Sequence, residues 1–461
     1  MILMMKANRS VLWLFQRKDL MTAEECVNYL QTFNAEKIPS IPVDIRLKHS
    51  QYTMEKHKGR TWILYNTLYN SMLTMSDREY KQYREQNFHD LDMVEVLADN
   101  GFIIPEYTDE FDRYNYYQKE LYNMFPSPAH YTVVLTTKCN ARCIYCYEKG
   151  VRYEDMSLQT AEKFSELLLR TEKNIDITWF GGEPLLNTKL IDIISNVLNS
   201  NNKEFTSGII TNGSLLSEEI IETRFKNWHI EWVQVTLDGM AEEYAKRKCY
   251  YNAKENNFDK IVENIDLLLA NNVNVSIRLN SDAENREECM RAAAFLKERY
   301  NGNMYLTVYP AFLTGDKNNL REMNERIKYT SSVYRMYPPE SELLSDNPKV
   351  NACFYQQPGA FVIDFDGSIL CCDRDVGKQK TKIGTVYEIE SFNDLKKPNE
   401  IIPKVREQCR SCVYYPKCGG GCRAAYSCRC EYDACFMERY KTEFLINKIS
   451  GVGSEVDNND V

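Results

Sequence analysis

The sequence predicts an α/β fold built around an open parallel sheet, and three observations lead to this class. Residues 131–312 alternate between short apolar runs, rich in β-branched and aromatic residues, and longer amphipathic stretches. Six such β–α units in series imply a parallel sheet with helices on its outer side. Six strands are too few for a closed eight-stranded barrel, so we expect a partial (β/α)6 barrel.

Each expected strand but the last ends in a cluster of polar or glycine residues. The strands are expected at 131–137, 175–180, 207–211, 232–237, 273–279 and 304–312, and helices between them at 157–173, 187–200, 258–272 and 287–300. Turns also favour glycine and asparagine, so one cluster alone carries little meaning. Because the carboxyl ends of parallel strands share one edge of the sheet, five clusters in register predict a single site there.

The composition is that of a globular protein with more than one domain. The chain has 461 residues, of which 43% are hydrophobic and 27% are charged. No apolar run approaches the roughly 18–20 residues of a membrane helix, and the N-terminus lacks a signal-peptide pattern. We therefore expect a cytoplasmic protein without a membrane partner. The net charge of −9, with scattered lysine and arginine, argues against a nucleic-acid partner.

Changes in pattern along the chain indicate five consecutive regions. These are an N-terminal module over residues 1–110, a linker over 111–130, a β/α core over 131–335, a cysteine-rich domain over 350–450 and a disordered tail over 451–461. In the first region, Ser76 and Glu79 form a capping box that predicts the start of a helix. A second helix is expected to end just before Gly101, a residue suited to a helix C-terminus.

The N-terminal module resembles a winged helix in its order of elements. Two strands are expected within residues 61–75, followed by the two helices and a further short strand. We expect Tyr65 and Tyr69 to lie near an exposed strand edge, which could accept a guest strand from a peptide. The alternative is that the module is a structural lid over the barrel.

The chain contains sixteen cysteines, which in a reducing compartment argue for metal ligation or thiol chemistry. The first set is Cys139-x3-Cys143-x2-Cys146, directly after the first expected strand. Three thiolates in one loop can ligate three irons of a cubane and leave the fourth iron open. A zinc site would normally take four ligands, so zinc is the weaker alternative.

With Tyr145 before the third cysteine, this spacing resembles the signature of the radical S-adenosylmethionine (SAM) superfamily. Gly181-Gly182-Glu183-Pro184 after the second strand resembles the superfamily's GGEP motif. The resemblance covers about residues 131–312. It implies a 4Fe–4S cluster that cleaves SAM to a 5′-deoxyadenosyl radical, with the SAM ammonium received by the glycine backbone and Glu183. The other residues that it assigns to the SAM site are Tyr145, Asn212, Thr236 and Arg278, and for the last three a structural role stays open.

A second set of seven cysteines resembles the SPASM domain of peptide-modifying radical SAM enzymes. Its members are Cys353, Cys372, Cys409, Cys412, Cys418, Cys422 and Cys435. The resemblance implies two auxiliary 4Fe–4S clusters, one held by Cys353, Cys372 and Cys422, the other by Cys409, Cys412, Cys418 and Cys435. The first would then have an open iron or use a further ligand among Cys371, Cys428 and Cys430. A zinc ribbon is the alternative.

Asp373 directly follows Cys372. In sulfatase maturases an aspartate at this place accepts the substrate proton, so the resemblance assigns Asp373 a catalytic role. The alternative is a solvated loop acid.

The resemblance therefore implies a peptide maturase that acts oxidatively on a precursor peptide or protein, for example by forming a thioether crosslink. Its electron donor would be a flavodoxin or ferredoxin, and its N-terminal module would bind a leader segment by strand addition. One alternative is an anaerobic sulfatase maturase, which forms formylglycine. An alternative of another class is a non-catalytic iron–sulfur or zinc-binding adaptor. The sequence does not name the peptide or the bond that is made.

Overall fold

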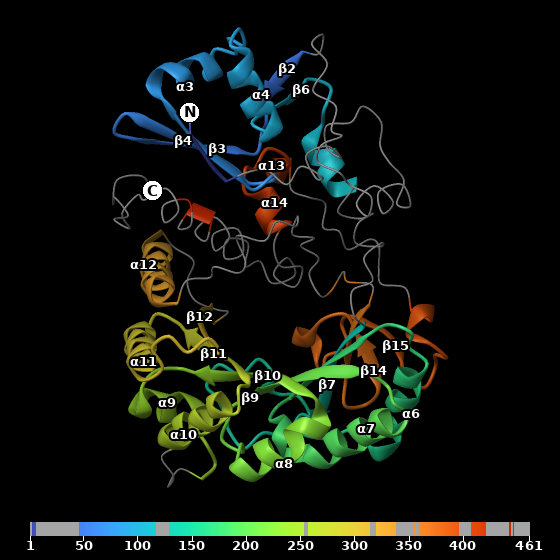
Figure 1. Ribbon diagram of the computed structural model, residues 1–461. Coiled ribbons are helices and arrows are strands. Elements are labelled where there is room, and N and C mark those ends of the chain that lie inside the picture. The colour runs from blue at the N-terminus through green and yellow to red at the C-terminus, as the bar shows by residue number, and fades with distance from the viewer. Residues whose placement is uncertain are drawn as a thin grey trace. The chain divides into compact units, whose positions relative to one another are not determined.

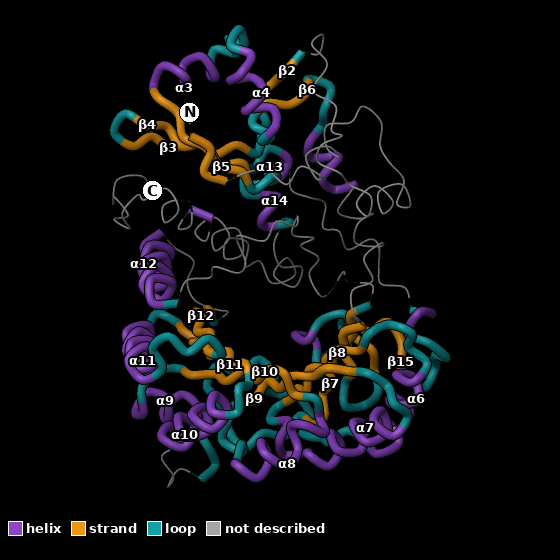
Figure 2. The backbone as a smooth tube through the Cα atoms, viewed as in Figure 1, coloured by secondary structure: helices purple, strands orange, loops and turns teal. Residues whose placement is uncertain are grey.

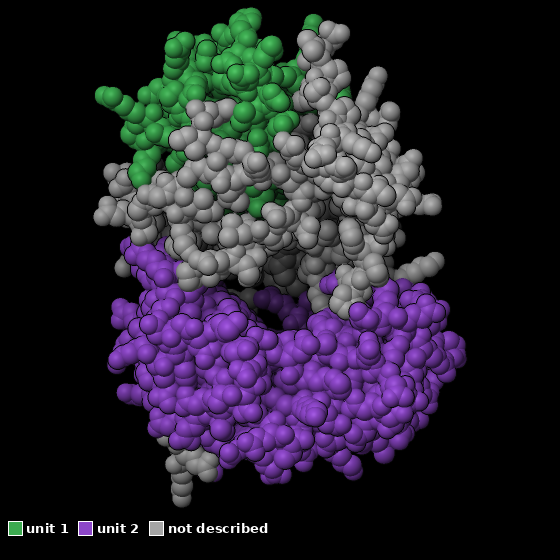
Figure 3. Space-filling model, viewed as in Figure 1, with its two compact units in different colours: residues 1–125, 339–353, 402–461 green, residues 126–338, 354–401 purple. Residues whose placement is uncertain are grey.

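The computed structural model describes residues 2–5, 46–116, 129–252, 257–313, 320–337, 355, 357, 359–395, 407–420, 442–443 and 446. The chain divides into two compact units, which Figure 3 shows in different colours. Unit 1 comprises Met1–Phe125, Pro339–Cys353 and Ile402–Val461, and unit 2 comprises Pro126–Pro338 and Phe354–Ile401. Each unit therefore combines segments that the sequence analysis assigned to different consecutive regions.

Unit 2 is built on a nine-stranded sheet with the order β12-β11-β10-β9-β8-β7-β13-β14-β15. Its first six members in the chain are β7 (Ala129–Thr136), β8 (Ile175–Gly181), β9 (Phe205–Thr211), β10 (Ile230–Leu237), β11 (Asn274–Ser281) and β12 (Leu306–Phe312). All neighbours among these six pair in parallel. The expected parallel sheet is therefore confirmed, and its six strands begin and end within two residues of the expected positions.

Three further strands extend this sheet beyond β7. They are β13 (Ala360–Ile363), β14 (Ser368–Leu370) and β15 (Lys382–Thr385). β13 pairs in parallel with β7, whereas β14 and β15 follow as antiparallel neighbours. Part of the region expected as a separate cysteine-rich domain thus continues the sheet of the β/α core.

Helices cover the outer side of the sheet (Figures 1 and 2). They are α6 (Leu158–Leu169), α7 (Thr188–Ser200), α8 (Glu218–Trp228), α9 (Ala241–Lys248), α10 (Asn257–Ala270) and α11 (Arg286–Arg299), followed by α12 (Leu320–Met336). Short 3-10 turns occur at η2 (Pro184–Asn187), η4 (Asp373–Asp375) and η5 (Phe392–Asp394). Alternate strand residues such as Val133, Trp179 and Ile277 are fully buried against these helices. The intervening Val134 and Phe180 are buried in a second cluster, so burial on both faces explains the near-continuous apolar runs of β7 and β8.

Unit 1 contains a four-stranded antiparallel sheet with the order β1-β5-β4-β3. The strands are β1 (Ile2–Met5), β3 (Thr53–Lys58), β4 (Thr61–Asn66) and β5 (Ser71–Ser76). The capping box of Ser76 and Glu79 starts α3 (Asp77–Arg84), and α4 (Leu91–Asp99) is followed by Gly101 with a φ of 74°. Both helix predictions are confirmed.

The rest of unit 1 consists of short elements. β2 (Leu47–His49) pairs with β6 (Ile103–Pro105), and residues 110–116 are helical. The cysteine-bearing segment contributes α13 (Glu407–Arg410) and α14 (Tyr415–Cys418). In the described part of both units, no helix has the length and apolar character that crossing a bilayer requires.

The expected exposed edge at Tyr65 and Tyr69 is wrong. β4, which carries Tyr65, lies between β3 and β5, so it is not an edge strand. The two side chains are only 4% and 1% exposed. Their aromatic rings fill the interior of unit 1, and among the described strands of this sheet the edges are β1 and β3.

Candidate functional site

The loop after β7 carries Cys139, Cys143 and Cys146 at the carboxyl edge of the parallel sheet. Cys139 and Cys143 are half-buried and Cys146 is exposed. Burial raises the pKa of the Cys139 thiol to about 12 and also raises the pKa of the other two thiols. Iron binding at these sulfurs would therefore have to displace their protons.

The end of α9 holds this loop in place through main-chain hydrogen bonds. The Arg142 N–H donates to the Lys248 carbonyl over 3.0 Å, and the Ile144 N–H donates to the Arg247 carbonyl over 3.0 Å. The Arg142 guanidinium also lies 4.4 Å from the centre of the Tyr251 ring. The path of the cysteine loop is thus fixed by a segment that lies about a hundred residues further along the chain.

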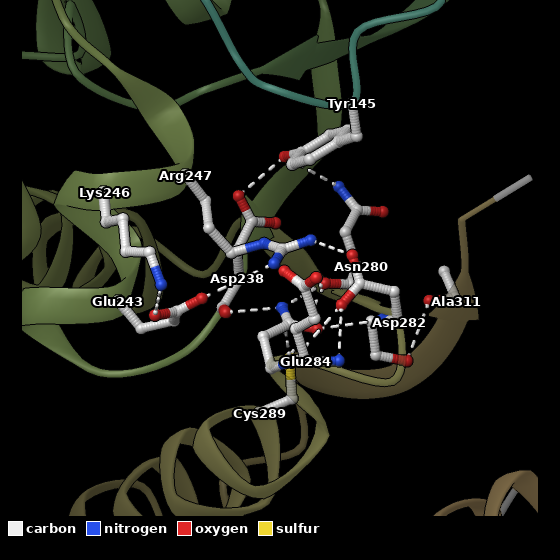
Figure 4. Close-up of polar contacts among 12 residues, drawn as sticks. Tyr145, Asp238, Glu243, Lys246, Arg247, Asn280, Asp282, Glu284, Cys289 and Ala311 are labelled. Atoms are coloured by element: carbon white, nitrogen blue, oxygen red, sulfur yellow. Dashed lines mark hydrogen bonds and ion pairs between the residues drawn. The ribbon is translucent and has the colours of Figure 1, made fainter. Parts of the chain in front are cut away.

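A buried polar network surrounds Tyr145. Its hydroxyl donates to Asp238 Oδ2 over 2.6 Å and accepts from Asn280 Nδ2 over 3.2 Å, as Figure 4 shows. Lys248 Nζ donates to the Tyr145 hydroxyl over 3.0 Å and to Thr236 Oγ1 over 2.5 Å. The tyrosine of the cysteine motif is therefore anchored by Asp238 just after β10, by Asn280 on β11 and by Lys248 at the end of α9.

Lys248 and Asp238 form a buried ion pair in this network. Lys248 Nζ lies 3.4 Å from Asp238 Oδ2, and the two side chains are only 2% and 0% exposed. Burial alone would lower the pKa of Lys248, but the charge of Asp238 and other neighbouring groups hold it well above its ordinary value. The sequence assigned no role to either residue: Lys248 belongs to no recognised spacing, and Asp238 lies in the polar cluster after the strand expected at 232–237 without a motif of its own.

A second ion-pair cluster lies next to the first. Arg247, whose side chain is 1% exposed, pairs with Asp282 and lies 3.5 Å from Glu243 (Figure 4). This arginine therefore ties α9 to the loop that follows β11.

Gly181 and Gly182 allow the end of β8 to pack against the chain that leaves β7. Gly181 has a φ of 135°, and a Cβ there would lie 2.1 Å from the Thr136 carbonyl oxygen. A Cβ on Gly182 would lie 2.5 Å from the Lys138 carbonyl oxygen. Both glycines are thus required for the close contact between the GGEP turn and the start of the cysteine loop.

Glu183 directly follows Gly182 and is fully buried. Its Oε1 accepts from Thr211 Oγ1 over 2.7 Å and from the Leu185 N–H over 3.2 Å, and its Oε2 accepts from the Asn212 N–H over 2.9 Å. Burial raises its pKa, against the effect of these donors. The carboxylate therefore joins the carboxyl ends of β8 and β9.

Asn212, Thr236 and Arg278 also lie at this edge. Asn212 Nδ2 donates to Asn140 Oδ1 over 2.8 Å and lies 3.9 Å from Cys139 Sγ. Thr236 and Arg278 are direct partners in the β10–β11 register. The buried Arg278 Nε has no hydrogen-bond partner among the described residues. Such a donor suits an acceptor supplied by a ligand.

Asp373 lies close to the loop of the first cysteine set. Burial raises the pKa of Glu148, two residues after Cys146, to about 7, and the nearby charges of Asp364 and Asp373 contribute to the rise. Asp373 is exposed, and its Oδ1 lies 3.6 Å from Cys372 Sγ. An exposed carboxylate beside this loop is able to accept a proton from a bound molecule.

The second cysteine set is divided between the two units. Cys372, with the buried Cys371 before it, belongs to unit 2, whereas Cys409, Cys412 and Cys418 belong to unit 1. The other cysteines assigned to auxiliary clusters lie outside the described residues, and these are Cys353, Cys422, Cys428, Cys430 and Cys435.

The residues at the strand ends fit a SAM and 4Fe–4S site by their chemistry. One loop offers three soft thiol ligands, and Arg278 Nε and Asp238 Oδ1 are buried atoms without a partner in the described chain. Across those same residues, no three His, Cys, Asp or Glu side chains are already grouped as a metal site. Binding would thus have to draw the three sulfurs together.

Comparison with known families decides the nature of this core. Residues 133–296 match the model of the Radical SAM superfamily. The chain contains a radical SAM domain. The match covers β7 to α11, which includes the cysteine loop, the GGEP turn and the network around Tyr145.

Curated relatives are similar to this chain at low identity. An uncharacterized protein of Methanocaldococcus jannaschii is 26% identical over 293 residues, which cover 60% of this chain and 93% of the relative. A cysteine-type anaerobic sulfatase-maturating enzyme of Clostridium novyi is 26% identical over 331 residues, which cover 62% and 86%. The radical SAM cyclopropyl synthase TigE of Paramaledivibacter caminithermalis is 25% identical over 203 residues, which cover 39% and 42%.

A solved structure shares the fold over a larger part of the chain. The structure of anSMEcpe with bound AdoMet superposes with a TM-score of 0.56 at 19% identity and covers 71% of this chain and 99% of that one. At this identity the likeness shows a shared fold and leaves the substrate open.

Proposed function

We propose that this chain is a radical SAM enzyme that oxidatively modifies a ribosomally made peptide, for example by forming a thioether crosslink. The observation that carries the proposal is the radical SAM match over residues 133–296, because it contains the cysteine loop and the GGEP turn at one edge of the sheet. The similarity to TigE and to a sulfatase-maturating enzyme supports a maturase.

The chain's own residues would bind and orient the reactants. When bound, a 4Fe–4S cluster at Cys139, Cys143 and Cys146 together with SAM supplies a 5′-deoxyadenosyl radical, which abstracts a hydrogen atom. The backbone of Gly181 and Gly182 would face the SAM ammonium. The side chains proposed to line the rest of SAM are Tyr145, Glu183, Asn212, Thr236 and Arg278, together with Lys248 as a cation near the cysteine loop.

The remaining assignments concern electrons and protons. Cys353, Cys372 and Cys422 would hold one auxiliary 4Fe–4S cluster, and Cys409, Cys412, Cys418 and Cys435 would hold the other. A flavodoxin or ferredoxin would supply electrons in a cytoplasmic setting.

Asp373 would accept the proton that the oxidised substrate loses. The N-terminal module, residues 1–110, would bind the leader of the precursor.

Sulfatase maturation is the second candidate. It is favoured by the 26% identity to the Clostridium novyi enzyme over 86% of that protein, and by Asp373 directly after Cys372. In this reaction a cysteine or serine of the substrate would become formylglycine.

Mass spectrometry of reaction products separates the two candidates. The anaerobically reconstituted chain is incubated with SAM, a reductant and either a cysteine-containing precursor peptide encoded beside its gene or a sulfatase-derived cysteine peptide. A thioether forms with loss of two hydrogens and retention of sulfur, whereas formylglycine forms with loss of sulfur. We expect the first outcome on the precursor. Formylglycine on the sulfatase peptide alone would establish the second candidate, and iron binding without SAM cleavage would indicate an adaptor.

A further inference from the structure

The four-stranded sheet of unit 1 is covered on both faces. Leu64 and Leu73 belong to a buried cluster with residues of α3 and α4. On the opposite face, Ile63 and Tyr65 cluster with Ile446 from the C-terminal part of the chain. Figure 1 shows α13 and α14 near the sheet, on the side away from α3. The sheet is therefore a middle layer, with the cysteine-bearing segment on one side of it.

Tyr415 anchors this segment to the helical residues 110–116. It lies between Cys412 and Cys418 in the sequence and is 4% exposed. Its hydroxyl donates to Asn115 Oδ1 over 2.6 Å, and its ring centre lies 5.0 Å from that of Phe111. The segment is thus fixed to the N-terminal part of unit 1 by a buried aromatic side chain.

The turn between β4 and β5 forms a second anchor. Thr67 Oγ1 donates to the Val413 carbonyl over 2.5 Å, and Lys417 Nζ donates to Asn70 Oδ1 over 3.1 Å. The Tyr65 hydroxyl donates to the same Asn70 oxygen over 2.6 Å. Both residues of the cysteine segment that make these contacts lie between Cys412 and Cys418.

A third link reaches the edge strand β3. Lys56 Nζ lies 3.5 Å from Glu443 Oε2, and the Tyr414 hydroxyl donates to Glu443 Oε1 over 2.6 Å. Lys56 and Glu443 are partly exposed, so their ion pair contributes little by itself. Together the three links connect the helical residues 110–116, the turn between β4 and β5, and the strand β3 to the segment between Cys412 and Cys418, the last of them through Glu443.

We infer that the N-terminal sheet is the scaffold of an iron site at Cys409, Cys412 and Cys418, so that iron binding and the folding of the sheet are coupled. The inference rests on the proposed auxiliary cluster at these cysteines. A group that binds only the folded segment stabilises whatever that segment packs against. Unit 1 is thus a metal-dependent unit, and residues 1–110 cannot be removed without disturbing the cysteine site.

Hydrogen exchange of the full reconstituted chain tests this coupling. The variant Cys409→Ala/Cys412→Ala/Cys418→Ala is compared with the wild type, and iron is measured in the same samples. The matched control is Cys139→Ala/Cys143→Ala/Cys146→Ala, which removes three ligands from unit 2. Each variant is expected to lose about four of about twelve irons. Only the first is expected to raise exchange in β4 and β5, by at least about tenfold.

The outcomes separate the two claims. Full retention of iron in the first variant would disprove the auxiliary site and, with it, the coupling. Loss of iron with unchanged exchange in β4 and β5 would disprove the coupling and leave the iron site in place.

A milder variant tests the same coupling if the Cys409/Cys412/Cys418 variant fails to fold. Tyr415→Phe removes only the hydroxyl that bonds to Asn115, and it is expected to release iron to a chelator several-fold faster than the wild type. Tyr387→Phe, which removes a hydroxyl bonded to Thr160 in unit 2, is the control and is expected to match the wild type. Equal release rates for both variants would overturn the scaffold assignment.

Discussion

Glu183 links the carboxyl ends of β8 and β9 by hydrogen bonds, and it also belongs to the GGEP motif, which indicates a contact with SAM. The Glu183→Ala variant leaves three buried donors without their acceptor, each at a cost of roughly 1–3 kcal/mol. We therefore expect its free energy of unfolding to fall by at least about 3 kcal/mol and its SAM affinity to fall as well. Urea denaturation and SAM titration of the same preparation measure the two effects.

The exposed Glu172 provides the control for this variant. Glu172→Ala is expected to change neither quantity. If Glu183→Ala lost SAM binding but unfolded at the same urea concentration as Glu172→Ala, the structural role of the carboxylate would be wrong, and a direct contact with SAM would be the better account.

Lys248 is the second residue whose role depends on burial. Removing one partner of a buried ion pair costs roughly 3–5 kcal/mol, because the other charge is left without compensation. Lys248→Met is thus expected to lower the free energy of unfolding of unit 2 by about that amount. It also removes the hydrogen bond that Lys248 Nζ donates to the Tyr145 hydroxyl. Lys246→Met is the matched control on the same helix, since the Lys246–Glu243 pair is largely exposed at the lysine and worth at most about 1 kcal/mol. Thermal unfolding that is equal for both variants would contradict the assignment.

The sequence predicted only those residues of this site that belong to short motifs with a characteristic spacing. The three cysteines and the GGEP turn are close in sequence, and their residue types are restrictive. Lys248 and Asp238 become a pair only when α9 folds back onto the cysteine loop. No local pattern carries that information, so the sequence could not reveal the cation beside Tyr145.

The GGEP turn is the element whose geometry is most restrictive. A side chain at Gly181 would meet the Thr136 carbonyl and would require a positive φ. Gly181→Ala is expected to cost several kcal/mol, since a steric clash adds roughly 1–3 kcal/mol to the roughly 1–2 kcal/mol of the unfavourable φ. Gly302→Ala, with a φ of 77° and open space around it, should show only the smaller cost. Equal denaturation midpoints for the two variants would refute the close packing.

Elements were predictable where burial imposed a pattern. The six parallel strands are buried on the side of the helices, so their apolar runs could be recognised in the sequence. The capping box of Ser76 and Glu79 could likewise be recognised from the spacing of the two residues. β3 was missed because its sequence, TMEKHK, is polar and becomes a strand only by pairing with β4. Tyr65 was misplaced at an edge because β3, which pairs with β4, was not recognised as a strand. Ile446, which packs beside Tyr65, lies more than three hundred residues away in the sequence.

The division of the chain into compact units is the feature that differs most from what the order of the sequence suggests. Consecutive regions were expected, but each compact unit is assembled from separate stretches of the chain. Cys372 and Cys409 therefore belong to different units although their spacing resembles one domain. Such an arrangement depends on contacts between distant segments, and the sequence pattern contains no record of them.

The stability of unit 1 is expected to depend on pH through Glu110. Its carboxyl is 2% exposed and accepts from Ser50 Oγ and the Gln51 N–H, and burial raises its pKa to about 7. Because the folded pKa lies above the unfolded value of about 4.5, the stabilisation is complete below pH 4.5 and is lost as the pH rises through 7. Amide exchange at Gln51, corrected for the intrinsic rate, is expected to show this loss between pH 5 and 8.

Glu110→Gln should remove this pH dependence, whereas Glu106→Gln, on an exposed carboxyl in the same stretch, should keep it. A pH profile that is unchanged in Glu110→Gln would assign the effect to another group.

The activity proposed for this chain begins with cleavage of SAM at the cysteine loop after β7. The most direct measurement is the formation of 5′-deoxyadenosine and methionine from SAM by the anaerobically reconstituted, chemically reduced protein. We expect the wild type to form both products and Cys139→Ala/Cys143→Ala/Cys146→Ala to form neither, while that variant keeps the irons bound elsewhere in the chain. If the triple variant formed 5′-deoxyadenosine at the wild-type rate, the assignment of SAM cleavage to this loop would be wrong.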